Sequence, residues 1–71
     1  MKKRQDVEIG REIRKRRLRK DIMQAELAEM VGIPKSYMCN IESGKRIPSL
    51  TVAVKIAKAL DCDVGDLLKA G

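Results

Sequence analysis

Apolar residues recur along the chain at helical spacing, in short segments separated by glycine, proline or aspartate. From about Val7 to Lys20, Ile9, Ile13 and Arg17 fall at i, i+4 and i+8, so they form one narrow row on a helix. The widest apolar stripe lies between residues 50 and 60 and comprises Leu50, Ala53, Val54, Ala57 and Leu60. The period near 3.6 residues predicts helices rather than strands.

Two shorter helices are predicted between these segments. The first runs from Gln24 to Val31, and Gly32 follows at the place where a helix end favours a positive φ. The second has Pro34 in its first turn, which makes Ile33 its N-cap, and ends at Gly44. Only about three residues join the two helices, so the sequence predicts a helix-turn-helix.

The end of the chain predicts two further helices. Ser49 has the hydroxyl that an N-cap needs and begins the fourth helix, which Asp61 ends. Asp63 caps a last turn over residues 64–70. We therefore expect an all-α, compact five-helix bundle. The 71 residues are predicted to form a single domain, with residues 1–6 as a flexible basic N-terminal arm.

Composition supports helix and argues against an enzyme. Trp, Phe and His are absent, while helix-favouring Ala, Leu, Glu, Lys and Arg are plentiful. Without histidine or a Cys-x-x-Cys pair we expect no metal site, no cofactor and no nucleophile–base pair. No apolar run approaches the roughly 18 residues of a membrane span, and no small-molecule ligand is evident. We expect a cytoplasmic protein with two free thiols.

The positive charge is concentrated at the beginning of the chain. Residues 1–20 contain ten basic and three acidic side chains, a net charge of +7, and the remainder has a net charge of −1. Such a basic segment suits a polyanion, either nucleic acid or an anionic membrane surface. A solvated helix face that aids solubility is the alternative.

Taken in order, these segments resemble the Cro/repressor-type (XRE-family) helix-turn-helix domain from about Ile9 to Leu68. The matching residues are Gln24, Glu26-Leu27-Ala28, Gly32, Ile41-Glu42, Ser43-Gly44-Lys45-Arg46, Pro48-Ser49-Leu50 and Ile56-Ala57-Lys58-Ala59-Leu60. The resemblance implies a lambda-repressor-like fold with the helix-turn-helix formed by helices 2 and 3. It also implies a transcriptional regulator, usually a repressor, that binds a pseudo-palindromic operator in double-stranded DNA as a homodimer and is thereby associated with the nucleoid.

The resemblance makes the third helix the recognition helix. Lys35, Ser36 and Asn40 then occupy positions that meet base edges or nearby phosphates, and their side chains suit that task because Lys can donate to guanine and Asn can pair with adenine. Gln24 begins the second helix, where it can help to hold a phosphate. The Lys45-Arg46 pair after the recognition helix matches the family's contact to the DNA backbone.

Two charged residues are assigned a structural role by the same resemblance. Arg17 lies in line with Ile9 and Ile13, and Glu42 lies beside Ile41, so both are unexpected choices for apolar surroundings. A partly buried ion pair between the first and third helices would explain them. The surrounding run RKRRLRK, with Arg16, is predicted to line DNA phosphates, because the first helix of such motifs crosses the backbone.

Several roles stay open at the level of sequence. Tyr37 can contact DNA or fill the small core, and Arg14 and Arg19 can simply face solvent. Cys39 is interpreted as a small filler on the recognition helix, with a redox switch near the DNA as the alternative. The apolar pair Leu67 and Leu68, with the turn before it, is our predicted dimer surface.

A second class of function remains possible for the same fold. The domain could be a protein-interaction module, such as an antitoxin or accessory factor, in which DNA binding is present or vestigial. Such a module should tolerate acidic or apolar residues at Lys35, Ser36 and Asn40. The polar and cationic residues found there favour DNA.

Overall fold

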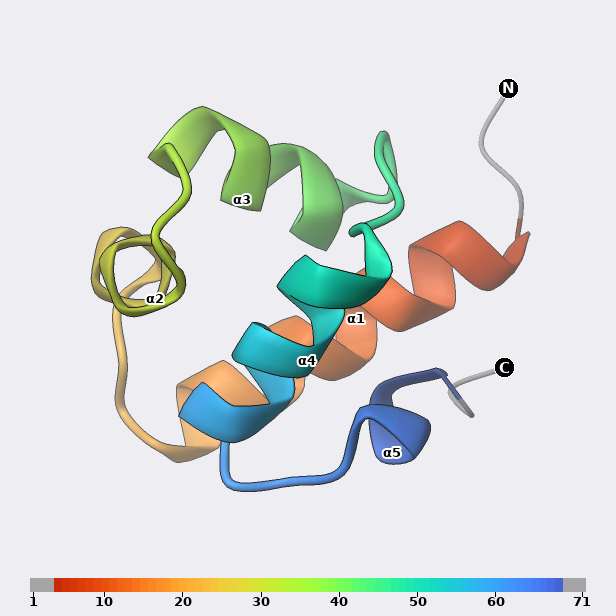
Figure 1. Ribbon diagram of the computed structural model, residues 1–71. Helices are drawn as coiled ribbons and strands as arrows, with labels where there is room; N and C mark the ends of the chain where they lie inside the picture. The colour runs from red at the N-terminus through yellow and green to blue at the C-terminus, as the bar shows by residue number, and fades with distance from the viewer. Residues whose placement is uncertain (1–3, 69–71) are drawn as a thin grey trace.

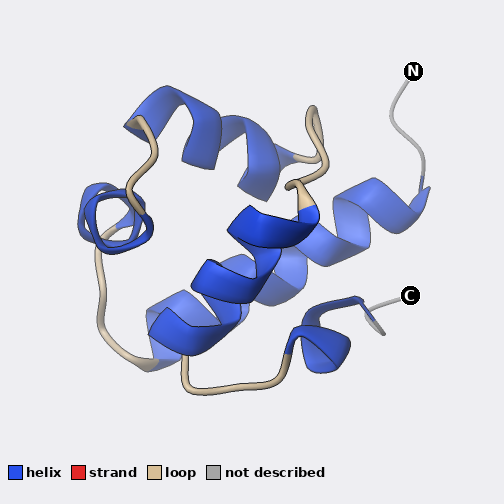
Figure 2. Cartoon of the chain, viewed as in Figure 1, coloured by secondary structure: helices blue, strands red, loops and turns tan. Residues whose placement is uncertain are grey.

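The computed structural model describes the backbone of residues 4–68 and the side chains of residues 7–68. Within this range the chain forms five helices (Figures 1 and 2). They are α1 (Arg4–Arg19), α2 (Gln24–Val31), α3 (Lys35–Ser43), α4 (Leu50–Ala59) and α5 (Val64–Leu68). The predicted all-α five-helix bundle is therefore confirmed, with α2 and α3 as the helix-turn-helix.

The first helix begins earlier than the sequence predicts. Residues 4–6 form the first turn of α1, where the sequence predicted part of the flexible arm. This segment contains no proline or glycine that would oppose a helix, and its charged residues are compatible with one. The rest of the predicted arm, residues 1–3, lies outside the described residues, as do the last residues of the predicted fifth helix.

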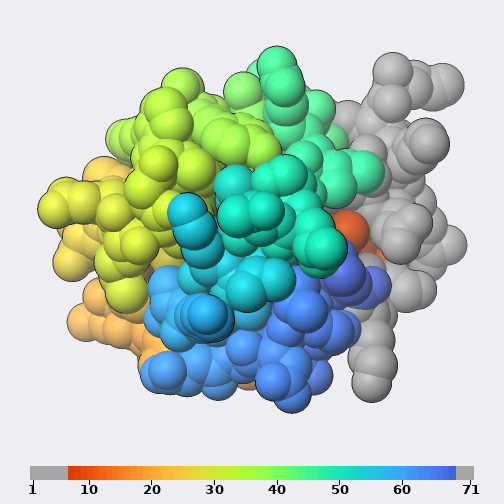
Figure 3. Space-filling model, viewed as in Figure 1, coloured from red at the N-terminus to blue at the C-terminus, as the bar shows by residue number. Residues whose placement is uncertain are grey.

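One side of each helix contributes to a single core. The largest fully buried side chains are Ile13, Leu27, Met38, Ile41, Ile56 and Leu67. Helix α1 packs against α3 and α5, α2 packs against α3 and α4, and α4 packs against α5. In Figure 3, α4 and the loop before it occupy the middle of the face shown, with α3 above and α5 below. This arrangement leaves the outer side of α3 uncovered.

The turn between α2 and α3 is fixed by glycine and proline. Gly32 adopts a φ of 83°, and its N–H and that of Ile33 both donate to the carbonyl of Ala28, at 2.9 and 3.0 Å. Pro34, rather than the expected Ile33, is the N-cap of α3, because its carbonyl already accepts the N–H groups of Tyr37 and Met38. The chain therefore turns sharply and α3 begins close to the end of α2.

The start of α2 lacks a side-chain cap from the N-cap residue itself. The Met23 side chain has no oxygen to offer, but the carboxylate of Glu26 accepts the Met23 N–H at 3.0 Å. Ser49 caps α4 by accepting the N–H of Val52 at 3.3 Å. No helix in the described part of the chain combines the length and apolar character that a membrane span requires.

Candidate nucleic-acid interface

The outer face of α3 is polar and faces away from the core. Met38 and Ile41 are fully buried, and the 100° rotation per residue places Ser36, Asn40 and Ser43 on the opposite side of the helix. Ser36 is exposed, while Asn40 and Ser43 are half-buried. Lys35 is exposed at the first position of α3. Of the predicted contact residues of α3, Ser36 and Asn40 therefore share one accessible face, while Lys35 lies about 100° around the helix from Ser36.

A groove of about 260 Å³ lies along one side of this face, between α1, α2 and α3. It is lined by Arg14, Arg17, Gln24, Cys39, Glu42 and Ser43. Arg14 is exposed there, so it lies beside the recognition helix instead of pointing to unrelated solvent. The sequence contained a signal for this position, because Arg14 precedes Arg17 by three residues and lies on the same side of α1.

A second groove, of about 270 Å³, lies along the other side of α3 and is lined by Ser36, Tyr37, Asn40 and Arg46. Its outer wall is the loop after Gly44, whose φ of 83° turns the chain back. The N–H groups of Lys45 and Arg46 donate to the carbonyl of Asn40, at 2.9 and 3.1 Å. The basic pair is therefore anchored to the end of the recognition helix.

Tyr37 lies between the core and the accessible face of α3. Its side chain is half-buried and packs against the hydrophobic core, and it also lines the second groove. The ring thus connects the interior to the accessible face of α3. This placement limits its freedom, so Tyr37 forms a fixed wall beside Asn40 and Arg46.

Arg17 and Glu42 form the predicted ion pair between α1 and α3. The guanidinium donates from Nε to Glu42 Oε2 at 2.8 Å and from Nη2 to Oε1 at 3.0 Å, and their side chains are 9% and 4% exposed. Arg17 Nη1 also donates to the carbonyl of Ile22 at 2.8 Å, and Gln24 Nε2 donates to Glu42 Oε1 at 3.3 Å. One buried carboxylate therefore connects α1, α2 and α3 and orients Gln24.

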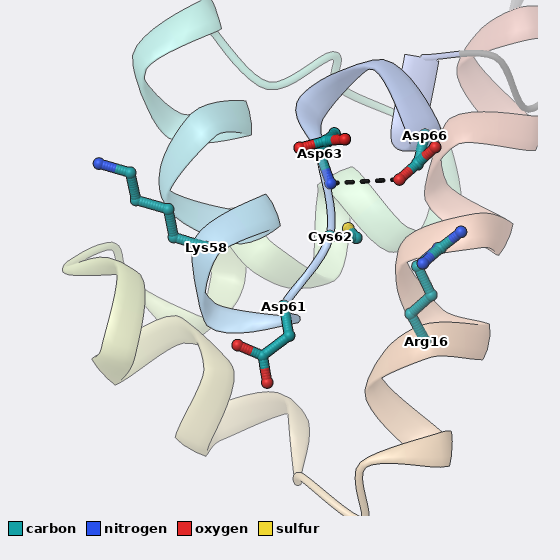
Figure 4. A pocket seen from close by; sticks show the side chains of 6 residues that line it. All are labelled: Arg16, Lys58, Asp61, Cys62, Asp63 and Asp66. Carbon is teal, nitrogen blue, oxygen red and sulfur yellow. Dashed lines mark hydrogen bonds between the residues drawn. The ribbon is translucent and has the colours of Figure 1, made fainter.

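Arg16, in contrast, is placed away from the recognition helix. Its Nε donates to Glu12 Oε2 at 2.6 Å, and the hydrogen bond from Lys15, together with that from Arg16, lowers the pKa of the Glu12 carboxyl. Figure 4 shows Arg16 across an open cavity of about 500 Å³ from Asp63 and Asp66. Arg16 therefore lies among carboxylates, which disfavours the phosphate contact predicted from the sequence, because one residue of helix rotates it by 100° from Arg17.

The two cysteines occupy different environments. Cys39 is exposed on α3 and lines the first groove, and Cys62 is half-buried in the turn between α4 and α5. Burial raises the pKa of the Cys62 thiol, which keeps it protonated and weakly reactive. Among the residues whose placement is described, no group of three or more potential ligands could hold a metal ion.

The chain is similar in sequence to transcriptional regulators and to a phage control-region protein. The transcriptional regulator SinR of Bacillus subtilis is 38% identical over 61 residues, which cover 84% of this chain and 55% of SinR. The ImmF control region 10 kDa protein of Bacillus phage phi105 is 30% identical over 59 residues, which cover 83% of this chain and 66% of that protein. The chain therefore spans less than two thirds of the length of these curated relatives.

Solved structures give the same result for the fold. SinR in complex with DNA matches with a TM-score of 0.80 and 38% identity, over 84% of this chain and 97% of that one. The restriction-modification controller protein C.AhdI of Aeromonas hydrophila matches with a TM-score of 0.82 and 36% identity, over 86% of this chain and 92% of that one. A family model described as helix-turn-helix matches residues 13–67. The chain therefore belongs to the Cro/repressor-type (XRE-family) helix-turn-helix family.

Proposed function

We propose that this chain is a sequence-specific DNA-binding transcriptional regulator that inserts α3 into the major groove. The observation that carries the proposal is the outer face of α3, where hydrogen-bonding side chains lie between two exposed cations, Arg14 and Arg46. No carboxylate among the described residues forms an ion pair with either cation. Both are therefore available to a polyanion.

The polar residues of this face fit the edges of bases. Lys35 can donate to guanine O6 or N7, Asn40 can pair with adenine N6 and N7, and Ser36 can donate or accept. A B-DNA major groove about 12 Å wide admits one α-helix of this kind. Gln24 and the free N–H groups at the start of α2 lie beside the first groove, where a phosphate would meet them.

We propose a homodimer as the binding unit, because pseudo-palindromic sites require two recognition helices. Leu67 is only 1% exposed and belongs to the core, so it cannot form the predicted dimer surface. Leu68, at 42%, remains available, and Leu50 is 71% exposed at the start of α4. Repression would follow from occupancy of a promoter, which needs no further activity of this chain.

The alternative, a protein-interaction module, is less well supported by the side chains on α3. An interface core is enriched in aromatic and apolar residues, whereas the outer face of α3 presents Ser36, Asn40 and Ser43. The exposed apolar residues Ile47 and Leu50 lie instead after the helix, in the following loop and at the start of α4. A protein partner would more naturally use that surface, leaving α3 free for DNA.

Selection from a pool of random DNA duplexes tests the proposal. We expect enrichment of a pseudo-palindromic sequence whose half-sites are centred about 10 bp apart, as for a dimer with two recognition helices. The logarithm of the binding constant should fall linearly with the logarithm of salt concentration, because bound phosphates release counterions. Failure to bind any duplex at low salt would eliminate the regulator and favour the interaction module.

The two neighbouring arginines of α1 should behave differently. Arg14→Ala removes an exposed cation from the first groove and is expected to weaken binding to all sequences and to reduce the salt slope by about 1. Arg16→Ala removes a side chain on the opposite side and should leave DNA binding unchanged. Titrations of both variants at several salt concentrations measure the difference. Equal losses of affinity would contradict the placement of α1 on the DNA.

A further inference from the structure

We propose that Arg46 reads a base pair, and that its target is a guanine next to the base pair contacted by Asn40. This inference rests on the proposed function. It changes the interpretation of the basic pair that follows α3, because the sequence gives Lys45 and Arg46 the same role on the DNA backbone. The structure distinguishes the two residues, since only Arg46 lines the groove beside α3.

The backbone fixes Arg46 relative to Asn40. The carbonyl of Asn40 accepts two N–H groups, from Lys45 at 2.9 Å and from Arg46 at 3.1 Å. The second hydrogen bond holds the backbone of Arg46 next to Asn40, the residue that is best suited to read adenine. Any movement of α3 in a groove of DNA would carry Arg46 with it, so the two side chains act on neighbouring positions.

The side chain of Arg46 is free to contact DNA, and Tyr37 lies beside it in the same groove. It is exposed and belongs to the groove that also contains Ser36, Tyr37 and Asn40. Tyr37 is held by the core and cannot easily give way. No ion pair with a carboxylate of the described residues draws the guanidinium elsewhere. Arg46 therefore lies beside the outer face of α3, with no ion pair to a described carboxylate that would hold its side chain elsewhere.

The chemistry of arginine selects the base. Its guanidinium presents two parallel donors that match O6 and N7 of guanine in the major groove, while the Asn40 amide matches N6 and N7 of adenine. A phosphate contact carries no base information, so replacing the arginine of such a contact by lysine would leave the base preferences unchanged. A lysine can contact guanine only without the rigid two-donor geometry. Base reading and phosphate binding therefore differ in their tolerance of Arg46→Lys.

The experiment repeats the selection on random duplexes with the wild-type chain, Arg46→Lys, Lys45→Arg and Asn40→Ala. We expect the wild-type site to prefer guanine at one position per half-site by roughly ten- to hundredfold. Arg46→Lys should lose most of that preference while keeping the salt slope, since the charge is unchanged. Asn40→Ala should lose the preference at the adjacent position only. Lys45→Arg keeps a cation at the predicted backbone contact, so it can change the overall affinity but should alter neither base preference.

The two Arg46 roles give opposite results in this design. If Arg46→Lys retains every base preference, Arg46 only contacts phosphate and the inference is wrong. If the lost preference lies far from the position that depends on Asn40, the proposed grouping in one groove is also wrong. Thermal unfolding of each variant checks folding, which should be unaffected because Arg46 is exposed and its loop bonds come from the backbone. Absence of any DNA binding by the wild-type chain is a different outcome, in which the proposed function itself fails and the inference with it.

Discussion

Gly10→Ala is expected to lower the free energy of unfolding by about 3 kcal/mol, the upper range for overpacking a core. A Cβ on residue 10 would lie 2.4 Å from the carbonyl oxygen of Ile41 and 2.6 Å from that of Glu42. These are backbone atoms of α3, so α1 and α3 would have to separate. In an unhindered helix the same substitution would stabilise by about 1 kcal/mol, and here the clash reverses the sign.

Chemical denaturation of Gly10→Ala beside Gly65→Ala measures this effect. Gly65 lies in α5, where an added Cβ meets no atom within 4 Å, so its replacement should be neutral or slightly stabilising. Small domains have a total stability near the lower end of about 5–15 kcal/mol, and a 3 kcal/mol loss should lower the melting temperature by more than 10 °C, at about 4–8 °C per kcal/mol. Equal stability of the two variants would show that α1 and α3 tolerate a wider separation.

Glu42→Ala is expected to destabilise the protein by roughly 3–5 kcal/mol. The substitution removes the carboxylate that accepts two hydrogen bonds from Arg17 and one from Gln24, and it leaves the Arg17 guanidinium almost buried with only the carbonyl of Ile22 as a partner. The penalty comes chiefly from the stranded charge rather than from the net value of the pair. Thermal and denaturant unfolding of the purified variant provide the measurement.

Two controls separate these causes. Lys20→Ala removes an exposed ion pair with Asp61 and should cost less than about 1 kcal/mol. The double variant Arg17→Met with Glu42→Leu removes both buried charges and should regain most of the stability lost by Glu42→Ala. A Glu42→Ala protein that melts at the wild-type temperature would mean that the buried pair does not anchor α3. Loss in the double variant equal to that of Glu42→Ala would assign the effect to packing.

The boundaries of the helices were largely predictable because they depend on local chemistry. Gly32 and Gly44 end α2 and α3 with positive φ, and Ser49 caps α4 with its own hydroxyl. Each of these residues acts within a few positions of itself, so a sequence contains the information directly. The start of α1 was the exception, since residues 4–6 contain no punctuation that marks a boundary.

The sequence predicted which polar residues share the outer face of α3, but not which basic residues of α1 lie beside that face. The residues of α3 lie on one short helix between fixed ends, so their common face follows from the sequence. Arg14 and Arg16 are both exposed or half-exposed cations in one basic run, and only the packing of α1 against α3 and α5 decides which of them lies beside the recognition helix. Because a helix rotates by 100° per residue, Arg14 lies beside α3, whereas Arg16 lies among carboxylates on another side of α1.

By itself the sequence determined the number and type of the helices, the short turn between α2 and α3, and the polar character of the recognition helix. It also indicated that Arg17 and Glu42 belong together. Only the tertiary structure decided that Gly10 must lack a side chain, that Leu67 is core and that Arg46 shares a groove with Asn40. Capping and turn preferences act between residues a few positions apart in the sequence. These three properties instead depend on which residues far apart in the sequence come into contact when the core packs.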